Sequence, residues 1–460
     1  MALIIWVFVF HHTMKSPMGW ISPTGLFALG MNIFLIVPSM YWQIRPWVYP
    51  IPGYFEGQSI VMIASAIIGI PFFVHALLSD NSEFPVQKIM PRRVEFGPGL
   101  WVMAIPVLVG LYWHTYLITL GHQARLQRIA PDATLDLVLG NLAFYFQACY
   151  FALFAFGNRA QRRAAVIIWV MDGFMQLYSL HRYFTLLFLL RSFVFINITG
   201  KTLRLRHFFA VGVAVVLVVS IIGRVSGLAW EEIEGSSKRF LSPYQAATLV
   251  GKAGSIFLSG EKHHMDESLH DQSAFFKTLD NAFFRLYEAR STGAVMSAVP
   301  ELIPYRYFEP FEHVFYSFIP RYFWPGKPKL SEINRLTEVV MEKDWGLNPV
   351  TTLGELYVSY GYFAIFLGGI ISFFVCHFVE WFFLNPRGAS PAMFVTYPSV
   401  FAVLFFAAND NFTRRYTEGL RGIFIIGMIG AVLWACKKIP LIVTNRQPQL
   451  AASQSPAGAE

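Results

Sequence analysis

The sequence predicts an all-α polytopic membrane protein with about 10–11 transmembrane helices and one large, mostly helical loop outside the cytoplasm. Three observations carry this prediction. Of the 460 residues, 55% are hydrophobic and only 14% are charged, whereas soluble domains carry about 25% charged residues. Apolar stretches of about 20 residues, the length needed to cross the hydrocarbon core, recur along the chain. Basic residues gather in the short connections between them, as the positive-inside rule describes.

The predicted spans follow from the apolar stretches. Ser22-Pro23 and Pro98 stand where two of them begin, in a pattern typical of helix starts. The first ten residues add a partial span. The predicted spans are 20–42, 58–79, 98–120, 135–157, 164–180, 183–199, 207–227, 353–384, 392–408 and 418–436.

The net charge of +8 does not indicate nucleic-acid binding, because it is not gathered on one soluble segment. Residues 227–350 hold 16 acidic and 13 basic side chains, a net of −3, and the rest of the chain holds 12 and 23, a net of +11. The basic connections that favour the cytoplasm are 87–93, 158–163, 200–206 and 436–440.

Two topologies satisfy this charge pattern. In the first, 164–199 crosses the membrane twice and turns at 179–182. This topology puts Arg191 in mid-span, and inserting its charge costs about 2.5–3.5 kcal/mol unless the side chain is paired within the bundle. In the second, 182–206 lies along the cytoplasmic face and every earlier span is reversed. Both topologies place 228–350 outside the cytoplasm.

The chain therefore divides into four parts. N-terminal transmembrane helices occupy 1–227, a large loop occupies 228–350, C-terminal transmembrane helices occupy 351–440, and 441–460 is a polar, disordered tail. The loop has too many aromatic and amphipathic stretches to be disordered. We expect a folded lid that lies on the membrane edge or caps the bundle.

The loop contains one helical pattern with a charged face, 281-NAFFRLYEARSTGAVMSAV-299. Arg285 and Glu288 are three residues apart and share a face, and Arg290 lies round the side. This pattern fits a solvated face with a weak ion pair. It also fits an anion clamp, because the guanidinium binds phosphate oxygens bidentately and stays charged.

A stiff cationic stretch, 318-FIPRYFWPGKPKL-330, follows in the same loop. Its prolines exclude a regular helix or a central strand. Interfacial anchoring accounts for Trp324 and Tyr322. Anchoring does not account for Arg321, Lys327 and Lys329, because the positive-inside rule predicts few cations outside the cytoplasm. An anionic, lipid-linked partner would account for them.

Other candidates lie nearby. Glu355, at the outer mouth of the span 353–384, is a carboxylate in an apolar context. Arg414 and Arg415 can complete a cationic rim on the same side. His263, His264 and His270 match no standard metal-ligand spacing, so we expect no metal. The sequence has no Walker loop, no GxGxxG after a strand, no GxSxG and no HExxH, so nucleotide-driven transport and hydrolase chemistry gain no support.

The run IPRYFWPGKP (319–328), an arginine about 35 residues before it, and NPVTTLGELYVSYGYFAIFLGG (348–369) resemble Wzy-type oligosaccharide repeat-unit polymerases. These proteins group with O-antigen polymerases and ligases, and the resemblance covers about 280–370. It implies a GT-C-like membrane enzyme of the bacterial inner membrane, with its large loop and active site in the periplasm. It also implies an undecaprenyl-diphosphate-linked oligosaccharide as donor. The family's G-x-R element corresponds to Gly157-Asn158-Arg159, which the charge pattern places in the cytoplasm.

The implied reaction is metal-independent glycosyl transfer that polymerises repeat units into a surface or exo-polysaccharide without a cofactor. Preorganised cations would stabilise the departing diphosphate. The partners are the lipid-linked glycan and membrane lipids, with chain-length regulator and flippase proteins alongside. The alternatives are an O-antigen ligase and a lipid-linked oligosaccharide flippase, although the chain lacks the repeated halves typical of transporters. Catalytic candidates are Arg285, Arg321, Glu288 and Glu355, with Glu309, Glu312 and His313 as further bases, and substrate-binding candidates are Arg290, Lys327, Lys329, Trp324, Tyr322, Arg414, Arg415 and Arg159.

Overall fold

A computed structural model of the chain describes eleven continuous ranges and a few single residues between them. In this described part all regular structure is helical, with no strand. The ranges are 1–15, 19–44, 54–79, 98–119, 146–178, 182–199, 242–259, 289–308, 350–384, 391–406 and 411–413.

The helices outside 228–350 lie on apolar stretches expected from the sequence, and two further helices lie within the expected large loop. Three of them, Pro23–Tyr41, Glu56–Leu78 and Thr352–Phe383, are long and apolar enough to cross a membrane. The expected spans 207–227 and 418–436 lie outside the described residues except for single positions. The helices are α1 Ala2–Met14, α2 Pro23–Met31, the π-helical η2 Asn32–Ile36, α3 Val37–Ile44, α4 Tyr54–Leu78, α5 Ala104–Thr119, α8 Arg159–Tyr178, α9 Arg182–Ile198, α11 Pro243–Ser259, α13 Ala289–Ser297, α16 Thr352–Leu384 and α17 Pro391–Phe406, with short 3-10 turns η1 Gly19–Ile21 and η5 Pro98–Met103 and a further apolar helix Phe146–Phe156.

The start of α2 shows why the helix begins where the sequence indicates. The Ser22 hydroxyl accepts a hydrogen bond from the Gly25 backbone N–H at 3.0 Å, and Pro23 stands at the first helical position. Both features satisfy or remove donors that a helix N-terminus leaves without partners.

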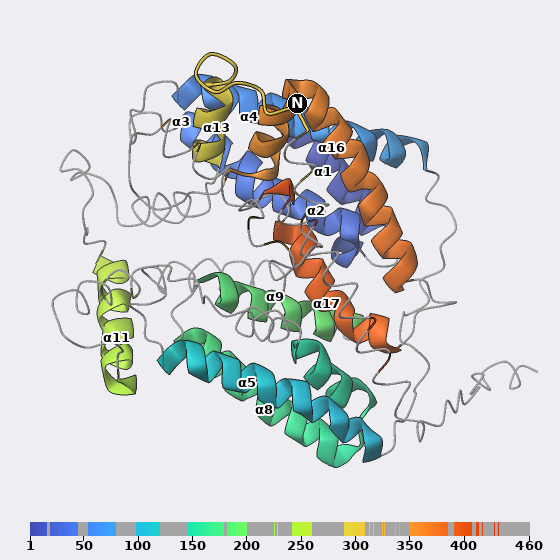
Figure 1. Cartoon of the computed structure of the whole chain (residues 1–460), viewed down its shortest axis with the longest axis vertical. Helices are drawn as coiled ribbons and strands as arrows, with labels where there is room; N and C mark the ends of the chain where they lie inside the picture. Colours follow the sequence, from blue (N-terminus) through green and yellow to red (C-terminus); the bar gives the residue numbers. More distant parts are fainter. Residues whose placement is uncertain are drawn as a thin grey trace, which may run out of the picture.

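Helices α4 and α16 run side by side in the same direction (Figure 1). Near their starts α13 packs on both. Midway, a Cβ added to Gly369 of α16 would meet the backbone of Ile68 at 2.6 Å. Towards their ends, the rings of His75 and His377 lie against each other. We call the end where α4 and α16 begin the loop end, and the other end the opposite end.

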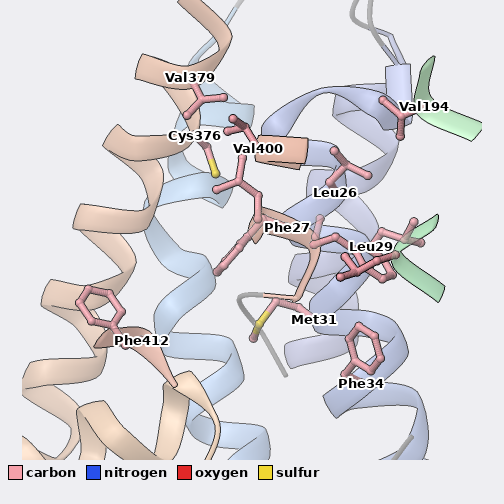
Figure 2. Packing of buried hydrophobic residues seen from close by; sticks show 14 of the residues in the cluster. Leu26, Phe27, Leu29, Met31, Phe34, Val194, Cys376, Val379, Val400 and Phe412 are labelled. Carbon is pink, nitrogen blue, oxygen red and sulfur yellow. The ribbon is translucent and has the colours of Figure 1, made fainter. Parts of the chain in front are cut away.

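Helices α2 and α17 run the other way, from the opposite end towards the loop end. Near the start of both helices, the Tyr397 hydroxyl of α17 donates to the Ile21 carbonyl at 2.6 Å. Near the end of α17, the ring centroids of Phe405 and of Phe34, in η2 directly after α2, lie 5.3 Å apart. The apolar side chains that α2, α16 and α17 turn towards one another, among them Phe27, Cys376 and Val400, meet in one buried cluster (Figure 2).

A second group of helices lies beyond α17 and contains α5, α8, α9 and Phe146–Phe156 (Figure 1). Helices α8 and α9 form an antiparallel pair, in which the Trp169 indole donates to the Ser192 hydroxyl at 2.8 Å. The first of the two topologies requires such a hairpin. Phe156 contacts Phe394 at the start of α17, with ring centroids 6.3 Å apart, so the 156–159 turn lies at the opposite end.

Candidate active site

Helix α16 is broken near its start. Tyr360 has φ −145° and ψ 30°, and Gly361 has φ +62° and ψ −144°. Glycine alone adopts the second conformation readily, because a Cβ would clash with the backbone. The sequence predicted one continuous span over 353–384. The structure instead separates a short first segment of about two turns from the long remainder.

A segment of the large loop lies against this break. The backbone N–H groups of Arg306 and Tyr307 donate to the carbonyls of Val358 and Ser359 at 2.9 and 3.1 Å. In an unbroken helix these carbonyls would accept from N–H groups one turn later. The break therefore offers carbonyl acceptors to the loop, and Arg306 and Tyr307 of the loop are hydrogen-bonded to the first segment of α16.

Helix α13 fixes the preceding part of the loop to the same place. A Cβ on Gly293 would lie 2.9 Å from the backbone of Gly57 in α4, so the two helices cross with their backbones in close approach. The Thr292 hydroxyl donates to the Thr351 hydroxyl at 2.9 Å and accepts from the Thr351 N–H at 3.1 Å. This part of the loop thus packs on the loop end of the bundle.

Glu355 lies in the first turn of α16, before the break. Its side chain is 1% exposed. One carboxylate oxygen accepts the backbone N–H of Thr413 at 3.0 Å, and the other accepts the hydroxyl of the same residue. Two donors on separate oxygens suit the ionised carboxylate, which is an acceptor at both oxygens. A helix N-terminus also favours a negative charge at this position.

Aromatic rings surround the break. Tyr360 packs edge-on against Tyr307 and Phe308, with centroids 5.3 and 5.2 Å apart, and Tyr357 packs against Tyr362 at 5.2 Å. Tyr307 and Phe308 are 58% and 62% exposed. Exposed aromatic faces of this kind suit a sugar ring or the membrane interface.

Trp324 and Glu312 are described as single positions of the loop. The Trp324 ring is half-buried and meets Tyr316 at 5.1 Å in an edge contact. The Tyr316 hydroxyl donates to a carboxylate oxygen of Glu312 at 3.1 Å. This hydrogen bond raises the pKa of the Tyr316 phenol above its usual value.

The structure places Arg159 away from Glu355. In the G-x-R sequence Gly157-Asn158-Arg159, Asn158 caps α8, because its side-chain oxygen accepts the backbone N–H of Gln161 at 3.0 Å. The side-chain oxygen of Gln161 in turn accepts the backbone N–H of Asn158 at 2.8 Å. This is the reciprocal pattern of a capping box. It lies at the opposite end, whereas Thr413, the partner of Glu355, follows the other extremity of α17, a helix about 24 Å long. The capping bonds account for Asn158 and Gln161, and Arg159 stays a predicted site residue that lies at the opposite end from Glu355.

Most remaining candidates fall outside the described residues. For Arg290 the structure describes the backbone at the start of α13 and not the side chain. The candidates on which it is silent are Arg285, Glu288, Glu309, His313, Arg321, Tyr322, Lys327, Lys329, Arg414, Arg415, His263, His264 and His270.

Asp172 of α8 is a second buried carboxylate, and it was not among the candidates predicted from the sequence. Its side chain is fully buried and accepts hydrogen bonds from Gln147 and Tyr150 on one oxygen, at 2.9 and 3.1 Å, and from Gln176 on the other, at 3.0 Å. Arg191 of α9 donates to the Gln147 side-chain oxygen at 3.2 Å. This hydrogen bond gives Arg191 a partner within the bundle, which is the condition that lowers its cost in the first topology. The signal available in the sequence was an aspartate within the apolar run that opposes Arg191.

Comparisons with protein-family models, curated proteins and solved structures found no significant match. The candidate site therefore rests on the residues of this chain.

Proposed function

We propose that this protein is a membrane glycosyltransferase that polymerises undecaprenyl-diphosphate-linked oligosaccharide repeat units at the periplasmic face of the bacterial inner membrane. The observation that carries the proposal is Glu355. It is a buried carboxylate in the first turn of α16, before the break, and it is held by a residue that directly precedes two arginines. The motif that resembles the polymerases, 348–369, contains both Glu355 and the glycine of the break.

The proposed reaction uses this carboxylate as a general base. The acceptor hydroxyl attacks the anomeric carbon of the donor sugar as its proton passes to Glu355. The bond between that carbon and the diphosphate oxygen breaks, and undecaprenyl diphosphate leaves with the bonding electrons. Such proton transfer contributes about 10²–10⁴ in rate. Because Glu355 is covered, the substrate reaches it when the segment that carries Thr413 moves.

Arginines would stabilise the departing diphosphate. Arg285 and Arg321 of the large loop are the arginines that the resemblance to the polymerases implies for this role. Arg414 and Arg415 directly follow Thr413 in the sequence. Their guanidinium groups match phosphate oxygens bidentately and keep their charge. Cations fixed before the substrate arrives need little reorganisation as charge develops.

The orientation of the helices supports the periplasmic assignment. Helices α4 and α16 run in the same direction, and the basic connection 87–93 follows α4. If that connection is cytoplasmic, as its charge indicates, both helices begin on the outer side, where the large loop packs. A cysteine in place of Ser273 should then react with an impermeant maleimide in intact cells whose outer membrane is permeabilised. Labelling only after lysis would reverse the assignment.

The glycan profile of a strain that lacks the protein tests the activity. A polymerase predicts surface glycans capped with single repeat units in the deletion strain. Long chains that accumulate on the carrier lipid would indicate the ligase instead, and loss of all outward-facing lipid-linked repeat units would indicate the flippase. The purified enzyme should keep its activity in EDTA.

A further inference from the structure

Two histidines face each other at the opposite end of the bundle, away from Glu355. His75 lies in the last turn of α4 and His377 lies in the second half of α16. Their Nε2 atoms are 3.1 Å apart, although the two residues are separated by 302 positions in the chain. His75 is exposed and His377 is half-buried.

The two Nε2 atoms lie within hydrogen-bond distance, but the rings do not meet head-on. Rings that met head-on at this Nε2 separation would hold their centroids about 5.4 Å apart. Rings whose Nε2 lone pairs converge on one ion would hold them about 4.8 Å apart, given metal–nitrogen bonds of about 2.05 Å. The observed separation is 4.6 Å, with the ring planes at 89°. The observed centroid separation is nearer to that of two ligands of a common ion than to that of rings that meet head-on.

The Nε2–Nε2 distance agrees with this arrangement. Two nitrogen ligands of one zinc ion lie about 2.9 Å apart at a right angle and about 3.4 Å apart at the tetrahedral angle. The 3.1 Å separation falls between these values.

Helix α16 also holds His377 in the required tautomer. Its Nδ1 lies 3.0 Å from the backbone carbonyl of Phe373. A carbonyl only accepts hydrogen bonds, so Nδ1 carries the proton, and in the neutral ring Nε2 keeps its lone pair. Metal-ligating histidines are oriented by this same bond from the second nitrogen. The ring of Phe373 also packs against both imidazoles, at 4.1 and 5.2 Å between centroids.

We propose that His75 and His377 bind one divalent transition-metal ion of the class that imidazole prefers, Zn²⁺, Co²⁺ or Ni²⁺. The ion joins α4 to α16, and water completes its coordination, because among the described residues no group of three His, Cys, Asp or Glu is arranged to hold a metal. His12 of α1 lies nearby but is engaged with the Ser79 hydroxyl at 2.9 Å. This site is separate from the glycosyl-transfer site and does not depend on the proposed function.

Binding of Co²⁺ to the full-length chain tests the proposal. The protein is purified in detergent, stripped of metal and titrated, with bound ion counted by equilibrium dialysis. Wild type should bind one equivalent more than His75→Ala or His377→Ala at the same free Co²⁺. His377→Gln, which keeps a polar side chain of similar volume, should lose the same equivalent. Equal binding by wild type and all three variants would overturn the site.

His11→Ala is the matched control, because His11 is an exposed histidine at the end of α1 and is not part of the pair. It should bind as much Co²⁺ as wild type. In a second measurement, Zn²⁺ should raise the unfolding temperature of wild type and of His11→Ala, because an ion that binds only the folded state stabilises it. An equal rise in His75→Ala would contradict a bridge between α4 and α16.

Discussion

Asp172 and Glu355 are both buried carboxylates in helices of a chain with few charges, and the difference lies in what holds them. The partners of Asp172 are side chains of α8 and of the helix Phe146–Phe156, and Arg191 of α9 joins the same network. Glu355 is held by Thr413, which lies after the end of α17. A carboxylate enclosed by packed helices can be released only by separating them. Glu355 is held instead by a residue at the start of another helical stretch, since residues 412 and 413 are helical, and it is released when that helix start moves.

Burial alone therefore does not mark a site in this protein. Asp172 is as deeply buried as Glu355, yet the printed bonds of its network join side chains of three helices. Glu355 lies in the helical turn that follows Thr351, the partner of Thr292 in α13, and its helix breaks at Tyr360 and Gly361. We infer that the first carboxylate stabilises the bundle and that the second is available for chemistry. The two inferences make opposite predictions for stability and for activity.

The largest effect is expected for Glu355→Gln. Glutamine keeps the shape of the side chain but not its basicity, so polymer formation on purified lipid-linked repeat units should fall by about 10²–10⁴. Helix content and detergent solubility should stay close to wild type. Initial rates and the length distribution of the product measure the change. A variant that is folded and keeps wild-type rates would show that Glu355 only anchors Thr413.

Asp172→Ala should act on stability instead. Removing one member of a buried charged network leaves the other uncompensated, which costs about 3–5 kcal/mol, so the variant should unfold at lower temperature and accumulate less. Activity per folded molecule should be unchanged.

The control for Asp172→Ala is the double variant Asp172→Ala with Arg191→Leu, which removes both charges. It should recover part of the lost stability, because non-additivity is expected for residues in one network. If Asp172→Ala abolishes activity at wild-type stability, Asp172 belongs to a site and the contrast with Glu355 fails.

The sequence predicted the helices better than the site. Helix positions follow from runs of apolar residues, which are local, so α4 and α17 begin within a few residues of the expected spans 58–79 and 392–408. Glu355 and Arg191 were recognised because a charge in an apolar run is costly wherever it points. Thr413 was missed because it is 58 residues from Glu355 and threonine carries no charge to signal a contact.

The break in α16 was missed for a different reason. Gly361 stands in an apolar run with several other glycines, and composition does not distinguish a glycine with positive φ from one in a regular helix. Arg159 shows the converse limit. Its short motif resembles a family element, and the motif did not predict the capping bonds between Asn158 and Gln161, which depend on local geometry. The role of Arg159 itself stays a prediction.

Thr413→Val tests the contact that distinguishes Glu355 from Asp172. Valine keeps the volume and the backbone N–H but removes the hydroxyl donor. A hydrogen bond to a charged group contributes about 1.5–3 kcal/mol. We expect a loss of stability within this range and a fall in polymer smaller than that of Glu355→Gln. Thr413→Ser, which keeps the hydroxyl, should behave like wild type, and equal behaviour of the valine and serine variants would show that the hydroxyl contributes nothing.

The smallest effect is expected for Gly361→Ala, which asks whether the break itself matters. A Cβ at this positive φ is strained by about 1–3 kcal/mol, and it would also lie 3.4 Å from the Tyr305 hydroxyl. If alanine instead restores a regular helix, the carbonyls of Val358 and Ser359 no longer accept from the loop. In either case we expect a lower unfolding temperature and shorter polymer, because the loop is less firmly held beside Glu355. Gly254→Ala in α11 is the matched control: an added Cβ meets nothing within 4 Å there, and replacing a helical glycine should stabilise by about 0.5–1 kcal/mol. If Gly361→Ala were as stable and active as Gly254→Ala, the break would have no part in holding the loop, and Glu355 would differ from Asp172 only through Thr413.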